Sequence, residues 1–143
     1  MNDMNERLFL HVRNSFDAIP PANEAVSQWL ESRQVAAPAC YLANLAVEEL
    51  VTNSIKYGYD DTAAHEIEIS LALSEGGIVL TVSDDGRAFN PLAAPEPDTN
   101  LPMEERPVGG LGIYLLRKLA DGMTYERRDG HNIVTIVKRT ACA

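Results

Sequence analysis

The sequence is poor in cysteine and contains no long apolar run. Two of its 143 residues are cysteines, Cys40 and Cys142, which is too few for a disulfide framework or a cysteine-based metal site. No apolar stretch approaches the roughly 18 residues that cross a bilayer, and residues 1–6 lack the basic and apolar regions of a signal peptide. We therefore expect a cytoplasmic protein that does not bind membranes.

Basic residues are also scarce. The chain carries 12 Lys and Arg against 21 Asp and Glu, a formal net charge of −9, whereas nucleic acids and anionic lipid surfaces select partners rich in Lys and Arg. Both are therefore excluded as partners. The charge is uneven, because residues 1–105 hold 18 acidic and 5 basic residues and residues 106–143 hold 3 acidic and 7 basic ones. The acidic part offers a surface to protein partners.

The apolar residues predict one α+β domain over residues 1–143. Hairpins outnumber crossovers, so we expect a two-layer α/β sandwich in which helices cover one face of a mixed, mostly antiparallel sheet. Residues 84–109 interrupt all periodicity and hold five of the eight prolines, which is typical of a functional or disordered loop. The periodicity predicts strands over 6–12, 66–73, 78–82, 124–128 and 133–138, and helices over 20–34, 38–57 and 110–121.

The predicted helix 38–57 carries two polar residues on its apolar face. Glu49 and Asn53 lie one turn apart, on the stripe that contains Leu42, Ala46 and Leu50. A buried carboxylate is costly unless it is paired or has a chemical task, and an amide oxygen beside a carboxylate suits Mg²⁺. The alternative is that both side chains lie at the solvated rim of the stripe.

Two further motifs flank the long irregular segment. Asp84 ends an apolar strand and Gly86 permits a tight bend, so the carboxylate can accept a hydrogen bond from an exocyclic amine; a simple turn is the alternative. Beyond the segment, Gly109-Gly110-Leu111-Gly112 opens a helix, where backbone N–H groups favour an anion. A flexible hinge is the alternative for this motif.

In this order, the three motifs resemble the Bergerat-fold ATP-binding domain shared by gyrase, histidine kinases and MutL. Glu49 and Asn53 match its first box, Asp84-x-Gly86 its second and Gly110-Leu111-Gly112 its third. The resemblance covers about residues 8–139 and leaves little room for a second domain. Within the superfamily, residues 46–59 and 110–113 are similar to the anti-sigma factor serine kinases of bacteria.

The resemblance implies ATP and Mg²⁺ as cofactors and a role for each matching residue. Glu49 would orient or deprotonate an attacking serine hydroxyl, and Asn53 would give its side-chain oxygen to Mg²⁺. Asp84 would accept a hydrogen bond from the adenine amino group, with Gly86 allowing close approach. Residues 90–109 would form the ATP lid. The phosphates would be contacted by Lys56, Arg106, Gly110 and Gly112, although Lys56 can equally be a solvated helix-end lysine.

Three positions depart from the pattern of the family. Ala88 stands where many relatives have a second glycine, and Tyr57 stands where many have a histidine. Relatives often carry Gly-Thr before the last strand, with the threonine near adenine, whereas this sequence has Gly130-His131-Asn132. Thr135 lies two residues beyond Ile133 on the same strand face and is the candidate substitute.

The resemblance also implies protein partners. Such kinases phosphorylate a serine of a STAS-domain antagonist, otherwise hold a sigma factor inactive, and depend on a phosphatase that resets the antagonist. A homodimer is expected on the same ground, with the face of Leu8, Phe9 and Leu10 as a candidate contact. The alternative function is a regulatory module that binds ATP to shape a protein-binding surface and transfers no phosphoryl group.

Overall fold

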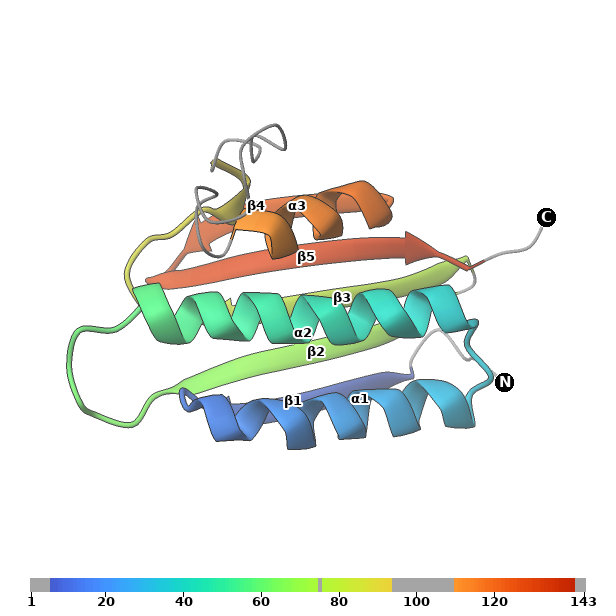
Figure 1. Ribbon diagram of the computed structural model, residues 1–143, viewed down its shortest axis with the longest axis horizontal. Helices are drawn as coiled ribbons and strands as arrows, with labels where there is room; N and C mark the ends of the chain where they lie inside the picture. The colour runs from blue at the N-terminus through green and yellow to red at the C-terminus, as the bar shows by residue number, and fades with distance from the viewer. Residues whose placement is uncertain (1–5, 75, 94–109, 141–143) are drawn as a thin grey trace.

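A computed structural model describes residues 6–74, 76–93 and 110–140. In this part of the chain, three α-helices lie on one face of a five-stranded sheet (Figure 1). The α+β class and the two-layer arrangement are confirmed. The elements are β1 (Arg7–Arg13), η2 (Phe16–Ala18), α1 (Ile19–Ser32), α2 (Ala37–Tyr57), β2 (Glu66–Ser74), β3 (Gly77–Asp84), η3 (Pro91–Ala93), α3 (Gly110–Leu119), β4 (Gly122–Arg128) and β5 (His131–Arg139).

The strands run in the order β1-β2-β3-β5-β4, and all four neighbouring pairs are antiparallel. The sheet is thus antiparallel throughout rather than mixed. The reason is that β4 becomes an edge strand after α3, and the β4–β5 hairpin then brings β5 back beside β3. The hairpin turns at Asp129 and Gly130, whose φ values of 54° and 78° fit the two-residue turn that the sequence predicts.

The hydrophobic core lies between the sheet and the helical layer. Alternate residues of each strand face the helices, and in β3 the set Ile78, Leu80 and Val82 is buried. The central helix, α2, lies between α1 and α3 (Figure 1) and buries a wide stripe that runs from Ala39 to Ser54. Because α2 is held along its whole length, the polar residues near its C-terminal end have fixed positions.

Several element ends lie two residues from the positions that the sequence predicts, and contacts or backbone angles explain two of them. α1 ends at Ser32 because Gln34, two residues later, has a left-handed φ of 59°, which a helix does not continue. β4 begins at Gly122, two residues early, because the N–H of Asp121 already donates to the carbonyl of Val137 in β5.

β1 forms one edge of the sheet. Of the three residues expected on its exposed face, only Phe9 is exposed, at 64%. Leu8 and Leu10 point the other way and pack against the core, so the expected contact face is corrected to Phe9 alone. Within the described ranges, no helix is both long and apolar enough to cross a membrane.

Candidate nucleotide-binding site

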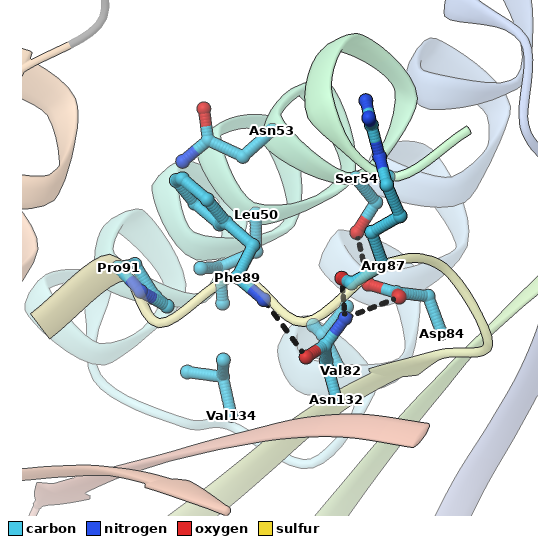
Figure 2. Close-up of a pocket in the computed structure, with 11 residues that line it drawn as sticks. Leu50, Asn53, Ser54, Val82, Asp84, Arg87, Phe89, Pro91, Asn132 and Val134 are labelled. Atoms are coloured by element: carbon cyan, nitrogen blue, oxygen red, sulfur yellow. Dashed lines mark hydrogen bonds between the residues drawn. The ribbon is translucent and has the colours of Figure 1, made fainter. Parts of the chain in front are cut away.

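The polar residues of two of the three motifs meet at one end of the molecule. There the C-terminal end of α2, the last residue of β3 and the start of β5 lie side by side, on the left in Figure 1. They surround a hollow, shown in Figure 2, whose lining combines apolar side chains with polar and charged ones. Its lining consists of Leu50, Asn53, Ser54, Gly58, Val82, Asp84, Arg87, Phe89, Pro91, Asn132 and Val134.

Asp84 lies at the bottom of this hollow and is held from three directions. Its Oδ1 accepts hydrogen bonds from the backbone N–H of Gly86 and from Nδ2 of Asn132, both at 2.9 Å. Its Oδ2 accepts a hydrogen bond of 2.6 Å from the hydroxyl of Ser54. A carboxylate oxygen has two acceptor sites. Among the described residues, Oδ1 is therefore saturated and Oδ2 keeps one site for a ligand.

The turn that follows Asp84 packs directly on the end of α2. The N–H of Arg87 donates to the carbonyl of Gly58 at 2.8 Å, and a Cβ on Gly86 would lie only 2.7 Å from that same oxygen. Arg127 of β4 adds a hydrogen bond of 2.8 Å to the carbonyl of Gly86. Gly86 is therefore needed for the close approach of two backbone segments, a reason that differs from the one we inferred from the sequence.

The first motif is fixed on α2 at the upper side of the hollow. Asn53 is 7% exposed and lines the hollow, and Glu49, one turn earlier, is partly buried. The carboxyl group of Glu49 lies against the backbone of Gly112, since a Cβ on that glycine would overlap it. Asn53 is thus not at a solvated rim, and Glu49 reaches the first turn of α3.

The surroundings of Glu49 change the pKa of its carboxyl group. Burial raises the pKa of the Glu49 carboxyl group, and the neighbouring charge of Glu48 raises this pKa further. The cation of Lys56, two turns later on α2, acts in the opposite direction. Glu49 therefore holds a proton more readily than a solvated carboxylate does.

Of the residues predicted to contact the phosphates, those that the structure describes do not line the hollow. Lys56 is exposed and is not part of its lining. Gly110 is the first residue of α3. Most of the predicted lid, residues 94–109 with Arg106 among them, lies outside the described residues. The part of the lid that the structure describes includes η3.

Thr135 is not brought to the hollow, and this assignment is corrected. In β5, Asn132, Val134 and Ile136 face the helices, while Thr135 points to the opposite face of the sheet, where it pairs with Thr81 and Thr124. Asn132 takes the polar position at the hollow instead. The alternation of side chains along β5 predicts this orientation, because Thr135 is out of phase with the buried apolar residues of the strand.

Two further residues of the site were missed, Ser54 and Asn132. Asn132 is a polar residue in phase with Val134 and Ile136, and Ser54 follows Leu50 by one helical turn. Both are polar residues at buried positions, at 8% and 4% exposure, and such residues need hydrogen-bond partners. A search for polar residues on the buried faces would have found them.

Aromatic side chains and a histidine support the walls of the hollow. Tyr57 and Phe89 stack with their ring centroids 5.2 Å apart. Behind the turn, the ring of Tyr59 stacks on His65 at 4.2 Å and its hydroxyl donates to Asp85. The hydrogen bond that the His65 ring donates to the Asp61 carboxylate raises the pKa of His65. The connection between α2 and β2 is thereby attached to the turn that contains Asp84.

Comparison with known proteins assigns the chain to a family. Residues 12–138 match the histidine kinase-like ATPase domain. The chain belongs to this family. Among curated relatives, the serine/threonine-protein kinase BtrW of Bordetella bronchiseptica is 25% identical over 101 residues, which is 71% of each chain.

Two serine-protein kinases named RsbW are also similar. Those of Oceanobacillus iheyensis and Bacillus mycoides are each 30% identical, over 91 and 94 residues, or 60% and 63% of this chain. The matches span 57% and 58% of these relatives, so the chain aligns with less than two thirds of their length.

A solved structure shows the same fold. The RsbU and RsbW domains of a Mycobacterium tuberculosis protein superpose with a TM-score of 0.69 at 15% identity. The match covers 97% of this chain and 34% of that one. The histidine kinase-like fold therefore extends over nearly the whole chain.

Proposed function

We propose that this protein binds ATP with Mg²⁺ and transfers a phosphoryl group to a serine of a protein partner, as an anti-sigma factor kinase. The observation that carries the proposal is the position of Glu49. Its partly buried carboxyl group lies on α2 one turn before Asn53 and against Gly112 at the start of α3. A carboxyl group, an amide and the first turn of a helix thus lie together beside the hollow that contains Asp84.

The chemistry of the residues that line the hollow suits recognition of an adenine base. Oδ2 of Asp84 has one acceptor site left after Ser54, and adenine carries an amino donor where guanine carries a carbonyl oxygen. Two acceptors facing each other would repel, so the carboxylate favours adenine. Leu50, Val82 and Val134 supply apolar surface for the faces of the ring. The acceptor oxygen of Asp84 and the apolar wall therefore suit adenosine rather than guanosine nucleotides.

Asn53 fits the role of a metal ligand. Its side chain lines the hollow from α2, and an amide oxygen is a hard ligand of the kind that Mg²⁺ prefers. Bound MgATP would supply the transferable phosphoryl group together with the charge that neutralises it. The backbone N–H groups at the start of α3, Gly110 and Gly112 among them, would face the phosphates, as helix N-termini commonly do.

Glu49 would act on the partner's serine. Phosphoryl transfer depends mainly on positioning and charge stabilisation, and one carboxylate that orients the nucleophile is sufficient. The Glu49 carboxylate would accept the proton of the serine hydroxyl as the serine oxygen forms its bond to the γ-phosphorus of ATP, while the bond from that phosphorus to the bridging oxygen breaks and ADP leaves with the electron pair. The fixed position of α2 would hold this carboxylate in place.

The partners follow from the kinds of relatives. BtrW and the RsbW proteins are named as protein kinases, and the resemblance implies a STAS-domain antagonist as the serine substrate and a sigma factor as the sequestered partner. A serine phosphatase would reverse the modification. A homodimer would add a second copy of this chain, for which the edge strand β1 is available.

A transfer assay with two matched variants tests the proposal. The protein is incubated with MgATP and the purified STAS-domain antagonist, and phosphoserine on the antagonist is measured by mass spectrometry. We expect Glu49→Gln to lower the rate at least about 100-fold, because it removes a proton acceptor, while ATP affinity is kept. Glu48→Gln removes the neighbouring, exposed carboxylate of α2 and should transfer at nearly the normal rate.

Three outcomes are informative. Transfer by Glu49→Gln at the wild-type rate would exclude Glu49 as the base. ATP binding without any transfer, in the presence of an antagonist that binds, would support the regulatory module instead. Failure of the wild type to bind ATP would contradict both functions.

A further inference from the structure

Asn132, at the second position of β5, makes more hydrogen bonds than any other side chain at the hollow. Its Nδ2 donates to Oδ1 of Asp84 at 2.9 Å and to the carbonyl of Arg87 at 2.7 Å. Its Oδ1 accepts from the N–H of Phe89 at 3.1 Å and from the hydroxyl of Tyr125 at 2.6 Å. Figure 2 shows three of these bonds converging on one amide.

The orientation of this amide follows from its partners. Asp84 Oδ1 and the carbonyl of Arg87 are acceptors only, so the group that faces them must be the NH₂. The N–H of Phe89 is a donor only, so the group that faces it must be the oxygen. An amide has two donor hydrogens and two acceptor sites. All four are used within the protein, and Asn132 has no capacity left for a ligand.

The partners of Asn132 come from three separate parts of the chain. Asp84 ends β3, Arg87 and Phe89 belong to the turn that leads towards η3, and Tyr125 lies in β4. The side chain is 4% exposed, and unpaired polar groups at such a depth are costly. The amide therefore fixes the spacing between the base-recognising carboxylate and the backbone that forms the wall opposite α2.

We propose that Asn132 is a positioning residue for base recognition, which sets the orientation of Asp84 without contacting the nucleotide. This role rests on the proposed ATP site. Because Asn132 and Gly86 saturate Oδ1, the free acceptor site of Asp84 lies on Oδ2 alone. The carboxylate then presents one acceptor, in one direction, to an amino group. Without the amide, Asp84 can rotate and the selection of that amino group weakens.

The experiment compares two ligands that differ in one group. ATP and purine riboside triphosphate share the sugar, the phosphates and the ring system, but the second lacks the amino group at position 6. Their dissociation constants are measured by calorimetry with Mg²⁺ for the wild type, Asn132→Leu and Asn132→Ser. A general loss of stability affects both ligands equally, so the ratio of the two constants reports the orientation of Asp84 and not the stability of the fold.

We expect the wild type to prefer ATP by about tenfold or more, as a hydrogen bond to a charged group provides. In Asn132→Leu, the preference should fall to within about threefold. Asn132→Ser has a side chain too short to reach Asp84 and leaves room for water at the freed backbone groups. If Asn132→Leu does not fold, the serine variant decides by the same ratio.

Thr135→Ala is the matched control, because Thr135 lies on the same strand but faces away from the hollow. It should keep the ratio of the wild type. A wild type that discriminates, together with Asn132 variants that keep its ratio, would overturn the role of Asn132 and leave the ATP site intact. A wild type that binds neither ligand would overturn the proposed function and this inference with it.

Discussion

At the scale of single residues, the surroundings of Glu49 lead to the most specific prediction, because they change the pKa of its carboxyl group. Burial raises the pKa of its carboxyl group, Glu48 raises it further and Lys56 lowers it. If Glu49 accepts the proton of the substrate serine, transfer requires its ionised form, and the rate must fall as the pH drops through this raised pKa.

We therefore expect the acid limb of the pH profile, the pH at which the transfer rate has fallen to half on the acid side, to lie above the ordinary glutamate pKa of about 4.3. Lys56→Met removes the cation that opposes the shift, so it should move the limb to higher pH. The measurement is the initial transfer rate at saturating ATP across the pH range, with ATP affinity recorded in parallel. A limb at the ordinary value, or one that Lys56→Met does not move, would contradict this explanation.

Gly112 gives a second test at the residue scale. A Cβ at this position would overlap the Glu49 carboxyl group, so Gly112→Ala must displace either Glu49 or the first turn of α3. We expect transfer to fall about tenfold or more, because small misplacements of reacting groups are costly. Gly76→Ala is the control, since no atom lies within 4 Å of its added Cβ. Equal rates for the two variants would place the catalytic group elsewhere.

Sequence reasoning found the residues whose spacing is local and missed those whose partners are distant. Glu49 and Asn53 follow from helical spacing, and Asp84 from its place at a strand end. Asn132 is 48 residues from the Asp84 carboxylate that it binds, and only the pairing of β3 with β5 brings the two together. The resemblance to the family suggests Thr135 as the threonine near adenine, but its phase in β5 places it on the face of the sheet opposite the helices.

At the scale of elements, the junction between α2 and the turn after β3 determines the shape of the site. The turn approaches so closely that a Cβ on Gly86 would lie 2.8 Å from Cα of Gly58. Arg127 and Asn132 hold the same turn from the side of β4 and β5. The described part of the site is therefore formed by elements that are held together by backbone contacts and hydrogen bonds.

Gly86→Ala should separate this turn from α2. Both sides of the contact are backbone, so neither can move aside at a low energetic cost. Overpacking of this kind lowers the free energy of unfolding by about 1–3 kcal/mol. Chemical denaturation, with Gly76→Ala as the reference variant, measures the loss. A variant as stable as the wild type would show that the two segments are free to move apart.

The elements themselves could be predicted from periodicity, because each strand and helix shows its own pattern of apolar residues. The exact ends could not, since they depend on partners in other elements. β4 begins early because Asp121 already bonds to Val137 of β5, and no local signal marks that contact. The antiparallel pairing of β3 with β5 likewise depends on the path of the chain through α3.

At the scale of the whole molecule, the fold brings Asn53 of α2, Asp84 of β3 and Asn132 of β5 together at one end of a helix-covered sheet (Figures 1 and 2). Glu49 lies one turn before Asn53 on α2. The chain as a whole carries a formal charge of −9. An acidic protein that binds a polyphosphate must use local donors, and helix N-termini and Mg²⁺ supply them.

The most direct test of the ATP site replaces one carboxylate oxygen of Asp84 by an NH₂ group. In Asp84→Asn, the donors Gly86 and Asn132 hold the remaining oxygen at the position of Oδ1, so the new NH₂ group takes the place of Oδ2. A donor then faces the adenine amino group, which is also a donor. Asp85→Asn makes the same exchange at the adjacent, exposed carboxylate and serves as the control.

The measurement is the dissociation constant of ATP with Mg²⁺ for the wild type and these two variants, by calorimetry. We predict that the wild type binds ATP, that Asp84→Asn weakens binding by at least about tenfold, and that Asp85→Asn changes it little. ATP binding of equal strength by the wild type and Asp84→Asn would contradict the assignment of this hollow as the nucleotide site.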